Sequence, residues 1–116
     1  MDTKTYYEIA RIARIRELND LLRRYGKGGD GYLTRGVRDR GDDFSERARR
    51  AVANFEAFTE DNDPHGEHDF GAVTIDGTRV FFKVDYYDRT KEWLSEDPAD
   101  PAKTSRVMTI LLAEEY

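Results

Sequence analysis

Apolar residues near the start of the chain recur with the spacing of an α-helix. Between residues 4 and 25 they follow one another at intervals of three or four positions, which places them on one side of a helix. The residues concerned are Ile12, Ile15, Leu18, Leu22 and Tyr25. Gly26 follows directly, and a glycine in the left-handed conformation is a common end of a helix. We therefore expect an amphipathic helix over residues 4–25.

A second helical pattern begins near residue 43. Residues 43–46 read Asp-Phe-Ser-Glu, which has the form of a capping box. In such a box Asp43 or a neighbour caps the helix, and the Glu46 side chain accepts the backbone N–H of the cap residue. The apolar residues that follow at helical spacing are Phe44, Ala48, Ala51, Val52, Phe55 and Phe58. Asn62 and the pair Asp63-Pro64 favour turns, so we expect this helix to stop at Thr59.

The segment between the two helices is rich in glycine. Residues 26–31 read Gly-Lys-Gly-Gly-Asp-Gly and lack the Gly-Lys-Ser/Thr ending of a phosphate-binding loop. A flexible linker or a contact loop therefore fits this segment better than a nucleotide site. We expect a short strand over residues 32–37.

The clearest strand pattern lies between residues 70 and 87. Two alternating runs, residues 70–75 and 78–87, flank Asp76-Gly77, the preferred pair for a two-residue hairpin turn. The turn fixes the register, because the numbers of paired residues must sum to 153, as those of Asp76 and Gly77 do. The face expected to form the core then holds Val73, Ile75, Val80, Phe82, Val84 and Tyr86.

The last third of the chain combines an acidic loop with an apolar run. Residues 95–101 read Ser-Glu-Asp-Pro-Ala-Asp-Pro, in which the prolines hold their neighbours extended. We expect Trp93 to fold back onto the core or the hairpin, and residues 106–113 to form a buried strand, with a short helix as the alternative. The sequence thus predicts an α+β fold, with two amphipathic helices packed on a small antiparallel sheet made of hairpin 70–87 and strand 106–113. At 116 residues, the chain 1–116 is expected to be a single domain.

Composition narrows the classes of function. The chain has no cysteine, which excludes disulfides, thiolate metal sites and cysteine nucleophiles. No apolar run approaches the roughly 20 residues that span a bilayer, and the start lacks the apolar centre of a signal peptide. We expect a soluble cytoplasmic protein without membrane contact. No motif in the chain indicates a cofactor.

The charge is divided unevenly along the chain. Residues 1–58 carry 13 Lys/Arg and 10 Asp/Glu, a net charge of +3, whereas residues 59–116 carry 6 and 14, a net charge of −8. An acidic half disfavours nucleic acid and favours a basic partner or a cation. Nucleic-acid binding would depend on Arg11, Arg14, Arg23, Arg24, Arg47, Arg49 and Arg50. Acidic residues interleave with these arginines, so nucleic acid is the least favoured partner.

The candidate chemistry gathers in residues 60–70, Glu-Asp-Asn-Asp-Pro-His-Gly-Glu-His-Asp-Phe, which hold both histidines of the chain. If the hairpin ladder continues past Phe70, His68 lies opposite Asp85, since 68 and 85 also sum to 153. A carboxylate opposite an imidazole can fix its tautomer and raise its pKa. His68 and Asp85 are therefore the candidate catalytic pair if the protein is an enzyme.

Several interpretations of this stretch stay open. His65, His68 and Asp85 could hold a zinc, iron or manganese ion in a metal-dependent enzyme. A calcium loop is excluded, because Ala72 stands where its bidentate glutamate belongs. The simplest interpretation is a polar connection between helix and sheet whose side chains satisfy backbone groups, with Gly66 allowing a positive φ.

Four blocks of the sequence resemble the signature of a small family. They are Asn-Asp-Pro-His-Gly-Glu-His-Asp-Phe-Gly at residues 62–71, Lys-Val-Asp-Tyr-Tyr-Asp at 83–88, Ser-Glu-Asp-Pro-Ala-Asp-Pro at 95–101 and Arg-Val-Met-Thr-Ile-Leu-Leu-Ala-Glu-Glu-Tyr at 106–116. The chain resembles, over about residues 9–116, a domain of unknown function met mainly in alphaproteobacteria, often on plasmids and other mobile elements. The resemblance implies no activity and no catalytic residues. It implies a mobile-element context, in which small acidic proteins often block a host nuclease or defence complex.

The favoured functional hypothesis is therefore a non-enzymatic binding protein. Its acidic surface would meet a basic protein partner, and the protein would be a mobile-element-encoded inhibitor of a host defence complex. The expected binding surface consists of Asp61, Asp63, His65, Glu67, His68, Asp69, Asp85, Asp88, Glu96 and Asp97. The metal-dependent enzyme is the alternative.

Overall fold

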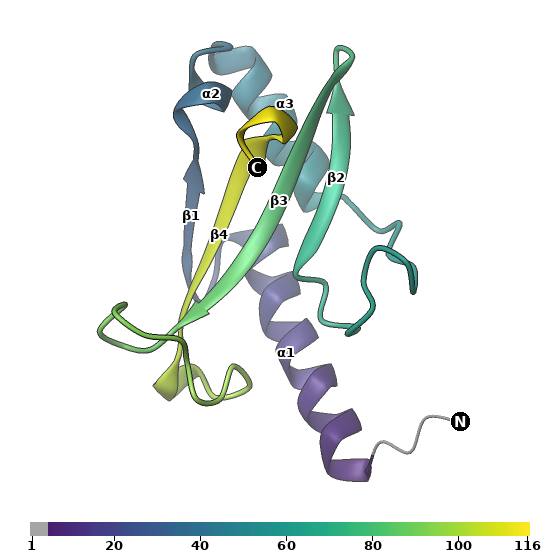
Figure 1. Cartoon of the computed structure of the whole chain (residues 1–116). Coiled ribbons are helices and arrows are strands. Elements are labelled where there is room, and N and C mark those ends of the chain that lie inside the picture. The colour runs from purple at the N-terminus through teal and green to yellow at the C-terminus, as the bar shows by residue number, and fades with distance from the viewer. Residues whose placement is uncertain (1–4) are drawn as a thin grey trace.

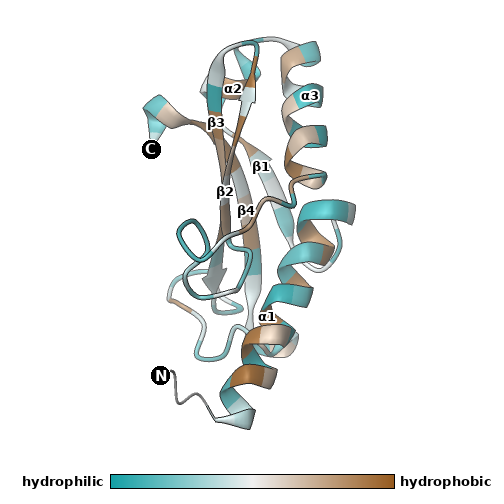
Figure 2. Cartoon of the chain, turned by 90° about the vertical axis from the view of Figure 1, so that its right-hand side faces the viewer, coloured by the Kyte–Doolittle hydropathy of each residue, from teal (hydrophilic) through white to brown (hydrophobic). Residues whose placement is uncertain are grey.

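The computed structural model describes residues 5–116 and shows an α+β fold, as the sequence predicts (Figure 1). The elements in chain order are α1 (Tyr6–Tyr25), β1 (Asp30–Leu33), α2 (Arg35–Arg38), α3 (Asp42–Ala53), β2 (Phe70–Ile75), β3 (Thr78–Tyr87), the 3-10 helix η1 (Pro101–Lys103), β4 (Ser105–Leu112) and the 3-10 helix η2 (Ala113–Glu115). The strands form one sheet in the order β1-β4-β3-β2. Helices α1 and α3 pack on one face of this sheet, and the C-terminal segment lies on the other (Figure 2).

The hairpin has the predicted register. Phe70 pairs with Lys83 and Ile75 with Thr78, and each pair of numbers sums to 153. Asp76 and Gly77 have φ values of 50° and 77°, the two positive values that a type I′ turn requires. The strand predicted over residues 106–113 is β4, which pairs antiparallel with β3.

The sheet is mixed, whereas the sequence predicts an antiparallel one. Strand β1 pairs with β4 in parallel, from Asp30 with Val107 to Leu33 with Ile110. The strand expected over residues 32–37 is β1, which begins at Asp30 and ends at Leu33. It ends because the Thr34 hydroxyl accepts the Val37 N–H and caps α2, as threonine commonly does at the start of a helix.

The hydrophobic core lies between the helices and one face of the sheet. Its residues include Leu22 of α1, Val37 of α2, Ala48 and Val52 of α3, Ile75, Val80, Phe82 and Val84 of the hairpin, and Met108, Ile110 and Leu112 of β4. The side chains of Val80 and Phe82 are completely shielded from solvent. The alternation read from the hairpin therefore assigns its core face correctly.

Helix α1 has the predicted extent at its end but projects beyond the sheet at its start (Figure 1). Gly26 caps it with a φ of 67°, and the Thr5 hydroxyl accepts the Glu8 N–H at its beginning. Residue 4, where the predicted helix begins, lies outside the described residues. No helix within residues 5–116 is long and apolar enough to cross a membrane.

Helix α3 is shorter than predicted, and its expected capping box is absent. Gly41 occupies the cap position without a side-chain hydrogen bond, and the helix ends at Ala53. At this end the buried Arg23 of α1 donates to the carbonyl oxygens of Val52, Ala53 and Phe55 at 3.0, 3.1 and 2.8 Å. These carbonyls thereby gain a donor that does not belong to the helix.

The loop between β3 and β4 stands away from the core. Trp93 is 72% exposed and Leu94 is 77% exposed, so the prediction that Trp93 folds back is wrong. Pro98 and the segment around it are fixed instead by polar contacts, because Arg106 donates to the Pro98 carbonyl oxygen.

Candidate functional site

The stretch from Glu60 to Asp69 is an irregular connection that joins α3 to β2. Asp63 is only 8% exposed, and its carboxylate accepts the backbone N–H groups of Glu67 at 3.1 Å and His68 at 3.2 Å. Gly66 takes a φ of 71° within the same turn. This part of the predicted binding surface therefore serves the backbone of the connection itself.

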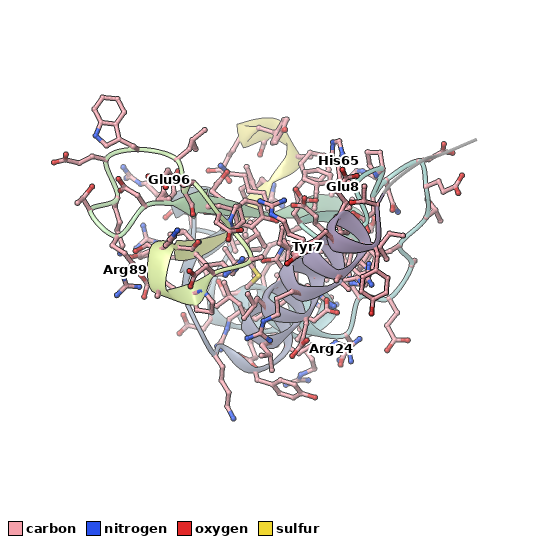
Figure 3. The ribbon with its side chains drawn as sticks, turned by 90° about the horizontal axis from the view of Figure 1, so that it is seen from below. Tyr7, Glu8, Arg24, His65, Arg89 and Glu96 are labelled. Atoms are coloured by element: carbon pink, nitrogen blue, oxygen red, sulfur yellow. The ribbon has the colours of Figure 1, made fainter. Side chains whose placement is uncertain are left out.

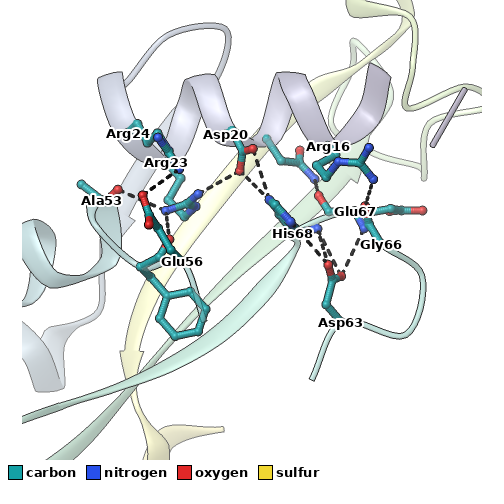
Figure 4. Close-up of polar contacts among 12 residues, drawn as sticks. Arg16, Asp20, Arg23, Arg24, Ala53, Glu56, Asp63, Gly66, Glu67 and His68 are labelled. Carbon is teal, nitrogen blue, oxygen red and sulfur yellow. Dashed lines mark hydrogen bonds and ion pairs between the residues drawn. The ribbon is translucent and has the colours of Figure 1, made fainter. Parts of the chain in front are cut away.

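His68 contacts α1 and does not pair with Asp85 as the sequence predicts. Its Nδ1 lies 2.9 Å from Asp20 Oδ1 (Figure 4), and its ring stacks on Phe58 with centroids 3.7 Å apart. The ladder ends before it, because β2 begins at Phe70 and a φ of 56° at His68 turns the chain toward the helix. The predicted pairing of His68 with Asp85 is therefore absent, because β2 begins only at Phe70, two residues after His68.

Asp20 links His68 to the buried arginine. Its carboxylate also lies 2.8 Å from Arg23 Nη2. Burial raises the pKa of Asp20, but the hydrogen bonds from Arg23 and His68 outweigh burial and hold this pKa below its ordinary value. The carboxylate thus neutralises a guanidinium whose side chain is fully buried.

A second buried network joins α1 to the sheet. The Asn19 amide donates to the Glu67 carbonyl oxygen at 3.0 Å and to the Tyr86 hydroxyl at 2.8 Å, and it accepts from Arg106 Nε at 2.6 Å. The Tyr86 hydroxyl in turn donates to the Glu67 carboxylate at 2.6 Å. Burial and this bond raise the pKa of Tyr86 well above its ordinary range. Glu67 is therefore committed to an internal contact.

The roles of Asn19 and Arg23 in these networks were not predicted, although the sequence contains a signal for them. Asn19 and Arg23 lie on the apolar side of α1, next to Leu18 and Leu22. A polar residue inside an apolar stripe has to find a partner in the core. Asn19 and Arg23 do so, and they fasten α1 to the rest of the domain.

The face of the sheet opposite the helices carries a hollow of about 630 Å³. We call it the acidic hollow; it is lined by Asn62, Pro64, His65, Asp69, Phe70, Lys83, Val84, Asp85, Leu111, Glu115 and Tyr116. The structure thus brings together three residues of the predicted site, His65, Asp69 and Asp85, and leaves His68 on the helix side. Phe70 and Tyr116 pack edge to face with ring centroids 5.9 Å apart.

The carboxylates of the hollow differ in their partners. Asp85 lies 2.8 Å from Lys83 Nζ, and this contact raises the pKa of Lys83. Glu115 accepts from the Thr34 hydroxyl and from the Leu112 N–H. Burial, followed by the negative charge of Glu67, raises the pKa of Asp69. Among residues 5–116, no lysine or arginine lies within ion-pair distance of Asp69.

The other predicted surface residues do not converge on this hollow. Asp61 and Glu96 are exposed, and His65 and Glu96 lie well apart (Figure 3). Asp88 accepts from the Thr90 N–H and hydroxyl within its loop. Asp97 lies 3.3 Å from Arg11 Nε. The acidic residues therefore form separate local groups.

The metal candidates do not converge either. Within residues 5–116, no three His, Asp or Glu side chains are arranged as ligands of one metal ion. His65 and Asp85 line the hollow, whereas His68 is held by Asp20 on the opposite side of the sheet.

Comparison with known proteins finds one family whose model matches the chain. The family described as "Protein of unknown function (DUF3768)" matches residues 33–115. This match leaves out α1, which supplies Asn19, Asp20 and Arg23 to the two networks. A search of curated proteins found no match, and neither did a search of solved structures.

Proposed function

The chain belongs to DUF3768, a family of proteins of unknown function, and from its own surface we propose that it is a non-enzymatic binding protein. The acidic hollow takes a basic side chain, an arginine or a lysine, that projects from a protein partner. The observation that carries this proposal is the half-buried carboxylate of Asp69, which has no lysine or arginine within ion-pair distance among the described residues.

The charged carboxylate of Asp69 lowers the stability of the free protein. Its raised pKa means that burial and the neighbouring Glu67 disfavour its charged form. A cation entering the hollow would reverse that balance, because an opposite charge close to a carboxylate favours ionisation. The stability lost in the free protein would then be regained on binding.

The rings beside Asp69 suit the same ligand. Phe70, Phe81 and Tyr116 form a cluster whose ring centroids lie 5.1 to 5.9 Å apart. An arginine or lysine head group is attracted to the face of such a ring, and its apolar stem can lie along it. Tyr116 is 77% exposed, so the cluster is accessible from solvent.

The charge of the chain supports a basic partner. Residues 59–116 carry a net charge of −8, and exposed carboxylates such as Glu96 would act at longer range by raising the rate of association. We further propose that the partner is a nucleic-acid-binding protein of the kind found in host defence complexes. Carboxylates in the acidic hollow would then take the place of phosphates on its basic surface.

The test compares single neutralised variants with a labelled triarginine peptide as the probe. Asp69→Asn is expected to weaken binding, measured by fluorescence anisotropy, by about fivefold to tenfold, because one close charge contributes about 1 kcal/mol. Asp61→Asn removes the same charge from an exposed site outside the hollow and serves as the matched control. Equal affinities for the two variants, or binding that does not saturate, would show that the hollow is not the site.

The same variants extend the test to real partners. Capture from the native host by immobilised protein should recover a basic protein with the Asp61→Asn variant and lose it with Asp69→Asn. The complex should also weaken as salt concentration rises, since exposed charges are screened.

A further inference from the structure

A second concave surface lies between the end of α1, strand β1 and α3. We call it the arginine groove; it has a volume of about 630 Å³ and is lined by Leu22, Arg23, Arg24, Tyr25, Gly26, Gly31, Tyr32, Leu33, Glu46, Arg49, Arg50, Ala53, Met108 and Ile110. We propose that it binds an extended, acidic peptide segment of a partner protein, which adds to the sheet as a strand beside β1.

The charge of the groove is opposite to that of the whole chain. Its lining contains four arginines and a single carboxylate, that of Glu46, in a protein whose net charge is −5. Arg49 and Arg50 share Glu46 at 3.2 and 3.5 Å, and Arg24 lies 3.6 Å from Glu56. The three exposed guanidinium groups thus have only two carboxylates between them.

The apolar part of the groove lies below these arginines. Leu22, Leu33, Met108 and Ile110 line it, and each belongs to the core or packs against it. Gly31 lines it too, without a side chain to fill the space. An apolar side chain of a ligand could therefore rest on this floor while its acidic neighbours reach the arginines.

Strand β1 offers backbone groups to a partner strand, because it is an edge of the sheet. The Thr34 N–H donates to the Ile110 carbonyl oxygen, and hydrogen-bonding directions alternate along a strand. The N–H groups of Gly31 and Leu33 therefore point away from β4. No acceptor within residues 5–116 is seen for them. An added strand would satisfy these groups, which is a common mode of peptide recognition.

These three features together select the chemistry of the ligand. In an added strand, alternate side chains share one face, so a segment of the pattern acidic, polar, apolar, polar, acidic would present both acids and the apolar residue to the groove. The first probe is accordingly the peptide Thr-Glu-Thr-Leu-Thr-Glu-Thr. The matched probe Thr-Lys-Thr-Leu-Thr-Lys-Thr has the same pattern with the opposite charge.

The experiment is an NMR titration of the complete chain with each peptide. The glutamate peptide should shift signals of Gly31, Leu33 and Met108 and slow hydrogen exchange at the amides of Gly31 and Leu33. The double variant Arg49→Glu/Arg50→Glu should weaken its binding about tenfold or more. The control variant Arg79→Glu, at an exposed site on β3, should leave it unchanged.

A second variant fills the groove. A Cβ on Gly31 would meet Met108 Cε at 4.0 Å, an ordinary contact, so Gly31→Val should fold and should reduce peptide binding by about the same factor as charge reversal. Its thermal unfolding curve reports folding independently.

Other outcomes would overturn the proposal. These are equal binding of the lysine peptide, no saturable binding of the glutamate peptide, and an equal loss with Arg79→Glu. Binding of dodecanoate in the groove, without peptide binding or amide protection, would identify a site for a small anionic amphiphile and would overturn it as well.

Discussion

His68 Nδ1 lies 2.9 Å from Asp20 Oδ1, and this contact joins the connection before β2 to a helix that lies outside the matched family region. The same carboxylate lies 2.8 Å from Arg23, which donates hydrogen bonds to the carbonyl oxygens at the end of α3 (Figure 4). His68, which the sequence suggested as one member of a catalytic pair, thus helps to hold α1 against the rest of the domain.

Replacing Asp20 by Asn should lower stability and change its pH dependence. The folded pKa of Asp20 is below the unfolded value, so the ionised group stabilises the fold above the unfolded pKa, and this contribution disappears as pH falls through the folded pKa. The variant should lose about 1 kcal/mol at neutral pH and little at about pH 2. Urea unfolding at both pH values measures the difference. An equal loss at both would contradict this role.

Replacing Arg23 by Met should be more damaging than the same change at its neighbour. Arg23→Met leaves the carbonyls of Val52, Ala53 and Phe55 without their donor and Asp20 without its cation, which should cost about 3 kcal/mol. Arg24→Met removes a partly exposed guanidinium 3.6 Å from Glu56 and should cost about 0.5 kcal/mol or less. Denaturant midpoints with unchanged slopes provide the comparison, and similar losses would argue against the buried role of Arg23.

Removing one hydroxyl tests the second network. Tyr86→Phe deletes the donor to Glu67 and the acceptor for Asn19, so it should destabilise the domain by about 1–2 kcal/mol. Tyr87→Phe makes the same chemical change on the opposite face of β3 and should alter stability by about 0.5 kcal/mol or less. If the two variants unfold at the same temperature, the Tyr86 hydroxyl contributes nothing.

Neutralising Asp69 should stabilise the free protein while weakening the proposed binding. Its folded pKa is raised, so the charged form costs stability above that pKa, and the cost disappears as pH falls through it. Asp69→Asn should raise the melting temperature at neutral pH by about 2 °C, or about 0.5 kcal/mol after allowance for solvent screening. The gain should vanish in acid. A lower melting temperature at neutral pH would mean that Asp69 has a stabilising partner.

Local patterns in the sequence were sufficient for the hairpin and for the C-terminal end of α1. Asp76-Gly77 sets the register because the pair is strongly preferred in a two-residue type I′ turn, and Gly26 ends α1 because its left-handed conformation stops the helix. Both features depend on residues close together in the chain. The α+β fold follows from them and from the apolar run that became β4.

Non-local contacts explain what the sequence did not predict. Strand β1 joins β4 across more than seventy residues, and α3 ends where Arg23 of another helix meets its carbonyls. His68 was misplaced because extrapolation of the ladder ignored its positive φ. The acidic hollow was only half foreseen: His65, Asp69 and Asp85 were candidates, but the aromatic partner Tyr116 was not.

The most direct test of the proposed function is a 15N NMR titration of the complete chain with the triarginine peptide. We predict saturable shifts at Asp69, Phe70 and Lys83 of the acidic hollow, and their loss in Asp69→Asn but not in Asp61→Asn. Shifts confined to other surfaces, or unchanged in Asp69→Asn, would contradict the account.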